Sequence, residues 1–244
     1  FFFKQKTAYE IVDCDWSSDV CSSDLTGGGS LATQRQRVLR NTYWLLALSM
    51  VPTVLGAWIG VSTGLMSAMA PGLSLIVFLV GSFGLMFAIE RTKHSAAGVG
   101  FLLAFTFFMG LMLSRLLAVV LSKGNGAALV MTAFGGTAGV FFVMATLASV
   151  IKRDLSGMGK FLMVGALVIF VAGLINFFVQ SSAMFLTLSV LCIGLFSAFM
   201  LYDIKRIIDG GETNYITATL AIYLDLYNVF QSLLSLLGIF GSDD

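Results

Sequence analysis

The sequence has little charge, and this scarcity excludes an ordinary water-soluble domain. Charged residues make up 11% of the 244 residues and hydrophobic residues 58%, whereas soluble domains carry about a quarter charged residues. The formal net charge is +1, which gives no reason to expect a nucleic-acid partner. The composition therefore indicates a protein whose main solvent is the lipid bilayer.

Histidine and cysteine are also scarce, which excludes several kinds of site. His94 is the only histidine, and the three cysteines suggest neither a disulfide framework nor a metal-ligand cluster. The sequence has no nucleophile motif, nucleotide-binding loop or metal-ligand spacing. We therefore expect no enzymatic activity, no resident metal and no cofactor.

The first residues do not follow the order of a targeting segment. A secretory signal has a basic start, an apolar core and a small-residue cleavage site, and residues 1–25 (FFFKQKTAYEIVDCDWSSDVCSSDL) lack that order. They resemble a translated sequencing-adapter read-through, and the alternative is a genuine disordered tail. The TGGGS that follows is typical of a join or a flexible linker. We expect residues 1–30 to be a disordered, non-native leader and linker, and residues 31–244 to form the folded domain.

Seven stretches are long and apolar enough to cross a membrane, which takes about 20 residues. They cover residues 43–61, 72–89, 97–121, 127–151, 161–179, 183–202 and 215–240. Barrel strands would alternate in polarity, and lipid cannot satisfy the backbone of an open sheet. The predicted fold class is all-α, a polytopic membrane protein with a bundle of seven transmembrane helices.

Small residues recur in the fourth and fifth of these stretches. They are Gly135, Gly136, Gly139, Gly165 and Gly173. Glycine lets membrane helices approach closely, so the pattern predicts tight packing there; ordinary membrane-helix composition is the alternative.

Lysine and arginine are distributed unevenly between the two sides of the predicted bundle. Ten of them lie on the side of the amino terminus: Arg35, Arg37, Arg40, Arg91, Lys93, Lys152, Arg153, Lys160, Lys205 and Arg206. The opposite loops contain Lys123, and Arg115 lies near the same end of the third stretch. Because cations are enriched in cytoplasmic loops, we expect a cytoplasmic amino terminus and a carboxyl terminus on the other side.

Asp225 is the most informative single residue. It lies about ten residues into the last stretch, roughly 15 Å from the inner end and so near the bilayer centre. A charged aspartate there costs on the order of 2.5–3.5 kcal/mol, and such residues usually serve a pathway, a relay or a switch. The alternative is a protonated Asp225 that only bonds a neighbouring helix.

Asp203 ends the sixth stretch, within FMLYDIKRII. It is either solvated or paired with Arg206 on its own helix, or it approaches Asp225 because a short loop makes the last two helices antiparallel neighbours. Two carboxylates brought close do not both ionise easily and titrate as a unit. The pair therefore predicts a pH switch.

The segment LYDIKRIIDGGETNYITATLAIYLDLYNVFQSLLSLLG resembles the signature of the Bax inhibitor-like family of seven-helix membrane proteins. RVLRNTYWLLALS, GLMF at 84–87 and GGTAGVFF at 135–142 resemble its bacterial YccA-like branch. The resemblance extends from about Val38 to Gly238. Members of that branch associate with the membrane protease FtsH and restrain it, so the resemblance implies an inner-membrane modulator of FtsH with a periplasmic carboxyl terminus.

The resemblance also implies an alternative function. In the wider family, an aspartate pair in the sixth and seventh helices is a pH-sensitive latch on a calcium leak, and a basic residue of the second helix takes part. Asp203 and Asp225 occupy the positions of that pair, which implies a pH-gated cation leak with Ca²⁺ bound only transiently. The second helix has no arginine in its interior, so Arg91 at its end is the candidate latch partner. A polar amino-terminal tail matters for the protease in the YccA-like branch, and here the leader stands in its place.

Overall fold

The structure is a computed structural model that describes residues 22–155 and 157–241, with side chains described from Thr33 onward. Within these ranges the secondary structure is helical, without strands. The helices are α1 (Ser22–Thr63), α2 (Leu65–Ala68), α3 (Pro71–Thr92), α4 (Ala96–Leu121), α5 (Gly126–Val150), α6 (Met158–Val179), α7 (Ser182–Ile208) and α8 (Tyr215–Phe240). All except α2 are long and apolar enough to span a membrane. The predicted fold class is confirmed, and the chain is a multi-pass membrane protein.

The predicted stretches match the helices closely, with three differences. α7 continues to Ile208, so Lys205 and Arg206 belong to its last turn and do not follow it. The short α2 was not predicted. α1 begins at Ser22, while residues 1–21 of the predicted leader lie outside the described residues, so the leader remains a prediction.

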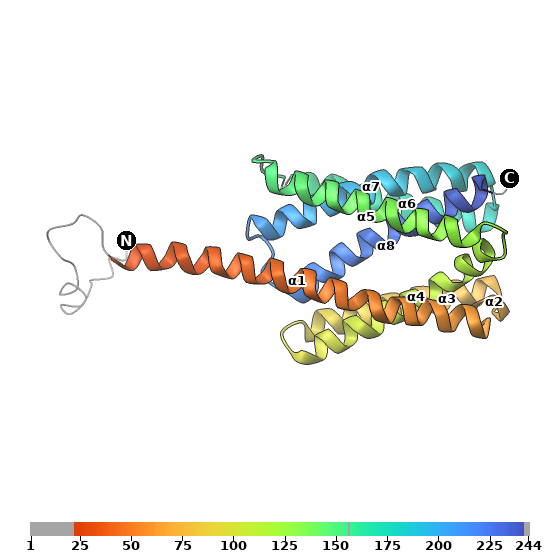
Figure 1. Cartoon of the computed structure of the whole chain (residues 1–244), viewed down its shortest axis with the longest axis horizontal. Coiled ribbons are helices and arrows are strands. Elements are labelled where there is room, and N and C mark those ends of the chain that lie inside the picture. The colour runs from red at the N-terminus through yellow and green to blue at the C-terminus, as the bar shows by residue number, and fades with distance from the viewer. Residues whose placement is uncertain (1–21, 156, 242–244) are drawn as a thin grey trace.

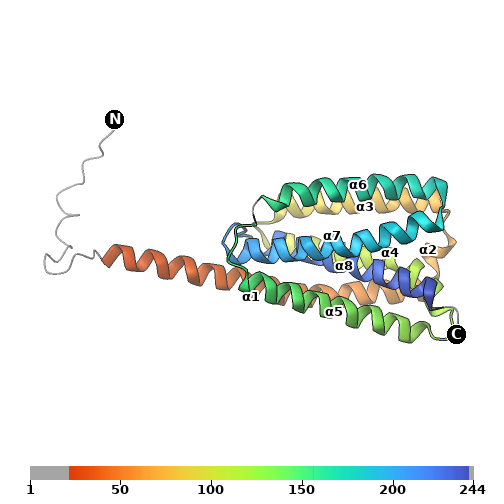
Figure 2. The ribbon, with the colours of Figure 1, turned by 90° about the horizontal axis from the view of Figure 1, so that it is seen from above.

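Helix α8 lies in the middle of the bundle (Figures 1 and 2), between a layer of α1, α3 and α4 and a layer of α5, α6 and α7. It is the least apolar of the seven spans and the one most buried by other helices. Its buried polar side chains include Thr219, Asp225, Ser232 and Ser235. Because polar groups in hydrocarbon are costly, a polar helix is most stable where other helices shield it from lipid. The main core therefore surrounds α8.

The closest packing joins α1 and α4, and two glycines make it possible. A Cβ added at Gly110 would lie 2.1 Å from the carbonyl oxygen of Thr53, and one added at Gly56 would lie 2.2 Å from the carbonyl oxygen of Phe107. Both obstacles are backbone atoms, so only glycine allows this approach.

The glycines singled out from the sequence are mostly elsewhere. A Cβ at Gly135, Gly139 or Gly173 would meet nothing within 4 Å, whereas Gly136 and Gly165 contact leucine side chains. The prediction of tight packing was therefore wrong for the first three. They lie on helix surfaces that no described residue approaches, so their small size does not serve helix contact.

Candidate functional site

The turn after α7 reverses the chain so that α8 can pack beside α7. The N–H of Gly211 donates to the carbonyl of Arg206 at 2.9 Å, and the N–H of Gly210 donates to the carbonyl of Ile207 at 3.1 Å. This is the Schellman pattern of a helix end. Gly210 has φ +81°, a conformation that a side chain would strain. The DGG segment thus ends α7 at a defined residue.

Glu212 and Asn214 then start α8. Oε1 of Glu212 accepts the N–H of Asn214 at 3.0 Å, and its Oε2 lies 3.4 Å from Nη2 of Arg206. Oδ1 of Asn214 accepts the N–H of Ile216 at 2.8 Å, which makes Asn214 the N-cap. Its amide also donates to the carbonyl of Lys93 at 2.7 Å and so ties the turn to α3. These bonds fix α7 and α8 relative to each other.

The structure brings Asp203 and Asp225 together between these helices. Asp225 is 4% exposed and Asp203 is partly buried. Their carboxyl groups are close enough to act on each other. Oδ2 of Asp225 is buried and receives no hydrogen bond from an N–H or O–H donor of the described residues. A proton held between the carboxyls would provide that donor, whereas two ionised carboxylates would repel each other.

A cation in the last turn of α7 acts on the pair. Arg206, one turn along α7, and Glu212 are the charged residues that act on Asp203 besides Asp225. Since Glu212 also binds Arg206, one guanidinium is shared between two carboxyl groups. The guanidinium of Arg91 lies 5.2 Å from the ring centroid of Phe87. Its proposed part in the latch remains a prediction.

Two tyrosines hold the opposite face of α8, and the sequence analysis missed them. The hydroxyl of Tyr223 lies 2.9 Å from Oγ1 of Thr53, and that of Tyr227 donates to the carbonyl of Met109 at 3.3 Å. Tyr223 and Asp225 are two residues apart, so they point to nearly opposite sides of the helix. Bonds to α1 and α4 thus set the rotation of α8 that directs Asp225 toward α7. The signal was available: two tyrosines four residues apart flank an aspartate in an apolar span.

The site could offer carboxyl oxygens to a cation, but it has fewer of them than a bound metal ion usually needs. The described residues contain no group of three or more histidine, cysteine, aspartate or glutamate side chains that could hold a metal ion. Ca²⁺ usually takes six to eight oxygen ligands, and two carboxyls supply at most four. The two carboxyls alone therefore do not complete the usual coordination of Ca²⁺.

The chain is similar to known membrane proteins over nearly its whole helical part. A family model described as "Inhibitor of apoptosis-promoting Bax1" matches residues 35–242. The chain is 41% identical over 208 residues to "Modulator of FtsH protease YccA" of Escherichia coli K12, which covers 85% of this chain and 92% of that protein. It is 37% identical to an "Uncharacterized membrane protein" of Vibrio cholerae, over 86% of this chain and 93% of that one. An uncharacterized Pseudomonas aeruginosa protein is also 37% identical, over 88% and 96%.

Proposed function

The chain belongs to the Bax inhibitor-like family, and on that premise we propose that it is an inner-membrane protein that binds the protease FtsH and restrains it. The observation that carries the proposal is the 41% identity to a protein named as a modulator of that protease, over 92% of its length. In this proposal the protein acts on the protease by binding it.

The lipid-facing helices provide the binding surface in this proposal. In the most apolar part of α3, α5 and α6 only 11% of the residues are buried within the bundle. These helices therefore present long apolar faces to the bilayer, where the transmembrane part of the protease also lies. The polar pair at the centre of the bundle stays away from this surface.

The orientation follows from the cations, and one contact supports it. Gly210 packs directly against the guanidinium of Arg35, since a Cβ there would lie 2.6 Å from Nε. The start of the first span and the carboxyl end of α7 thus lie at one end of the bundle, and both carry cations. We place that end in the cytoplasm and the carboxyl terminus in the periplasm.

Co-purification tests the proposed partner. The tagged chain is extracted from bacterial membranes in a mild detergent, and FtsH is detected in the eluate, with an unrelated tagged seven-helix protein as the control. A second version carries the amino-terminal tail of the E. coli relative ahead of Val38. FtsH should elute with both versions, because the helices bind it. Its absence from both eluates would count against the proposal.

The aspartate pair favours a second function, a pH-gated cation leak. When the pair holds a proton, Asp203 and Asp225 bond each other and α7 stays against α8. When the proton leaves, two negative charges face each other in a poorly screened site and favour separation of the helices. Water and a cation can then enter, so opening rises with pH. Fluorescent detection of Ca²⁺ entry into proteoliposomes at several pH values tests this function, and the same flux at every pH would rule it out.

A further inference from the structure

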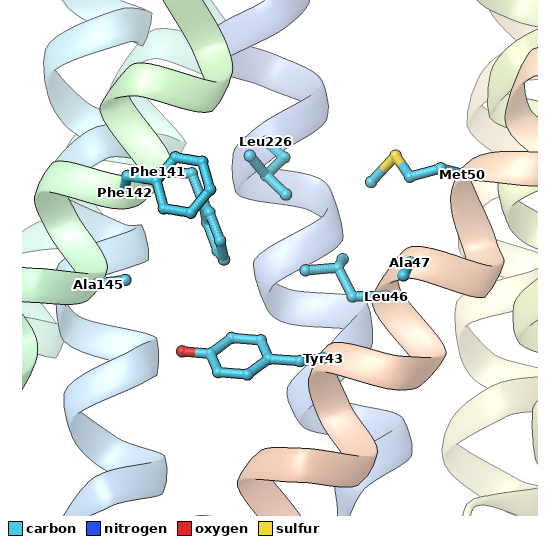
Figure 3. A pocket seen from close by; sticks show the side chains of 8 residues that line it. All are labelled: Tyr43, Leu46, Ala47, Met50, Phe141, Phe142, Ala145 and Leu226. Carbon is cyan, nitrogen blue, oxygen red and sulfur yellow. The ribbon is translucent and has the colours of Figure 1, made fainter.

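A groove opens between α1 and α5 at membrane depth, with α8 as its floor (Figure 3). Its volume is about 410 Å³, and Ala47, Met50, Ala145 and Leu226 are among the residues that line it. Tyr43 provides its only hydroxyl group. All these residues lie in membrane spans, so hydrocarbon surrounds the opening. The two alanines keep it open where larger side chains would fill it.

The groove is short. Tyr43 and Met50 lie seven residues apart on α1, so the groove extends about 10 Å along the helix. That is about a third of the roughly 30 Å of hydrocarbon that a spanning helix crosses. The groove therefore fits part of a flexible apolar chain better than a whole partner helix.

Each of the two helices that wall the groove has a cation near it in the sequence, toward the end of the bundle that we place in the cytoplasm. Arg40 lies one turn before Tyr43 on α1, and residues three apart are neighbours on a helix surface. Lys152 lies seven residues after Ala145, just beyond the end of α5 at Val150. Both cations are exposed, and neither forms an ion pair with a described residue. An apolar groove with a cation beyond each of its walls matches a molecule with an apolar chain and an anionic head.

We propose that this groove is a binding site for an anionic phospholipid, with one acyl chain in the slot and the phosphate between Arg40 and Lys152. Tyr43 stands at the boundary between the two parts, where aromatic hydroxyl groups commonly meet lipid headgroups. The site is independent of the proposed binding of FtsH. Leu226, which contacts the chain at the floor, is the neighbour of Asp225, so the lipid would pack directly against the helix that carries the pair.

Native mass spectrometry of the detergent-purified protein tests the site. The protein is titrated with phosphatidylglycerol or phosphatidylcholine, and the retained lipid is counted. We expect one phosphatidylglycerol to be retained at least tenfold more tightly than phosphatidylcholine. Arg40→Gln and Lys152→Gln should each weaken its binding about fivefold, which corresponds to about 1 kcal/mol per cation near an anionic headgroup.

Two substitutions in α5 separate the groove from the rest of the surface. Ala145→Phe fills the slot and should abolish retention, whereas Ala128→Phe, exposed on the same helix outside the groove, should leave it unchanged. Lys160→Gln, an exposed cation at the start of α6, is the control for charge. Equal retention of both lipids, or retention by Ala145→Phe as by the wild type, would overturn the proposal. Loss of FtsH from Ala145→Phe without any lipid retained by the wild type would overturn it in favour of a protein partner.

Discussion

Asp225→Asn isolates the charge that the proposed pH switch needs. Asparagine keeps the shape of the side chain and its ability to bond Asp203, but it cannot ionise. As a general magnitude, two unit charges about 4 Å apart at an effective dielectric constant of about 20 repel by roughly 4 kcal/mol. That repulsion is present only when both carboxyls are ionised. It would change the equilibrium constant between the closed state, with α7 against α8, and the open state by a factor of about a thousand, since each 1.4 kcal/mol is tenfold.

The assay is Ca²⁺ flux into proteoliposomes between pH 5 and pH 9. Wild-type flux should rise with pH as the pair loses its proton, and Asp225→Asn should give a low flux at every pH. Asp203→Asn should also flatten the profile, because repulsion needs both partners. The matched control is Asp209→Asn, an exposed carboxylate at the carboxyl end of α7 that binds Lys205 at 2.8 Å; it should keep the wild-type profile. If Asp225→Asn keeps that profile as well, the pH switch lies elsewhere, and Asp225 serves only in the packing of α8 against its neighbours.

Three further predictions follow from the packing and the orientation. Gly110→Ala should destabilise the fold by about 1–3 kcal/mol, because its Cβ would meet backbone; a thermal-unfolding scan should show a lower midpoint, and Gly135→Ala, in open space, should not change it. Tyr227→Phe removes the hydrogen bond to α4 and should cost about 1 kcal/mol by the same scan; an unchanged midpoint would deny the bond a role. Alkaline phosphatase fused after Asp244 should be active, since we place the carboxyl terminus in the periplasm, and an inactive fusion would reverse the orientation.

The seven spans could be predicted from the sequence because the length of an apolar run is itself the physical requirement for crossing a bilayer. The approach of Asp203 to Asp225 could also be expected, because a short GGETN turn leaves α7 and α8 few alternatives to antiparallel packing. Both inferences depend on local sequence, in which chain length and turn residues act directly.

The face of each helix that meets protein could not be predicted in the same way. Lipid tails and helix surfaces are about equally apolar, so composition does not distinguish Gly110, which contacts backbone, from Gly135, which contacts nothing described. Arg206 was considered only as a partner of Asp203 on the same helix, as an alternative to the aspartate pair. Its shared position between Asp203 and Glu212 depends on the path of the turn, which no residue pattern specifies.

Restraint of the protease is tested by the proteolytic rate of FtsH reconstituted in proteoliposomes with and without this protein. We expect a membrane substrate of FtsH to be degraded several-fold more slowly when the protein is present in excess, and an unrelated seven-helix protein at the same density to have no effect. An unchanged rate, with both proteins shown to be inserted in the same vesicles, would contradict it.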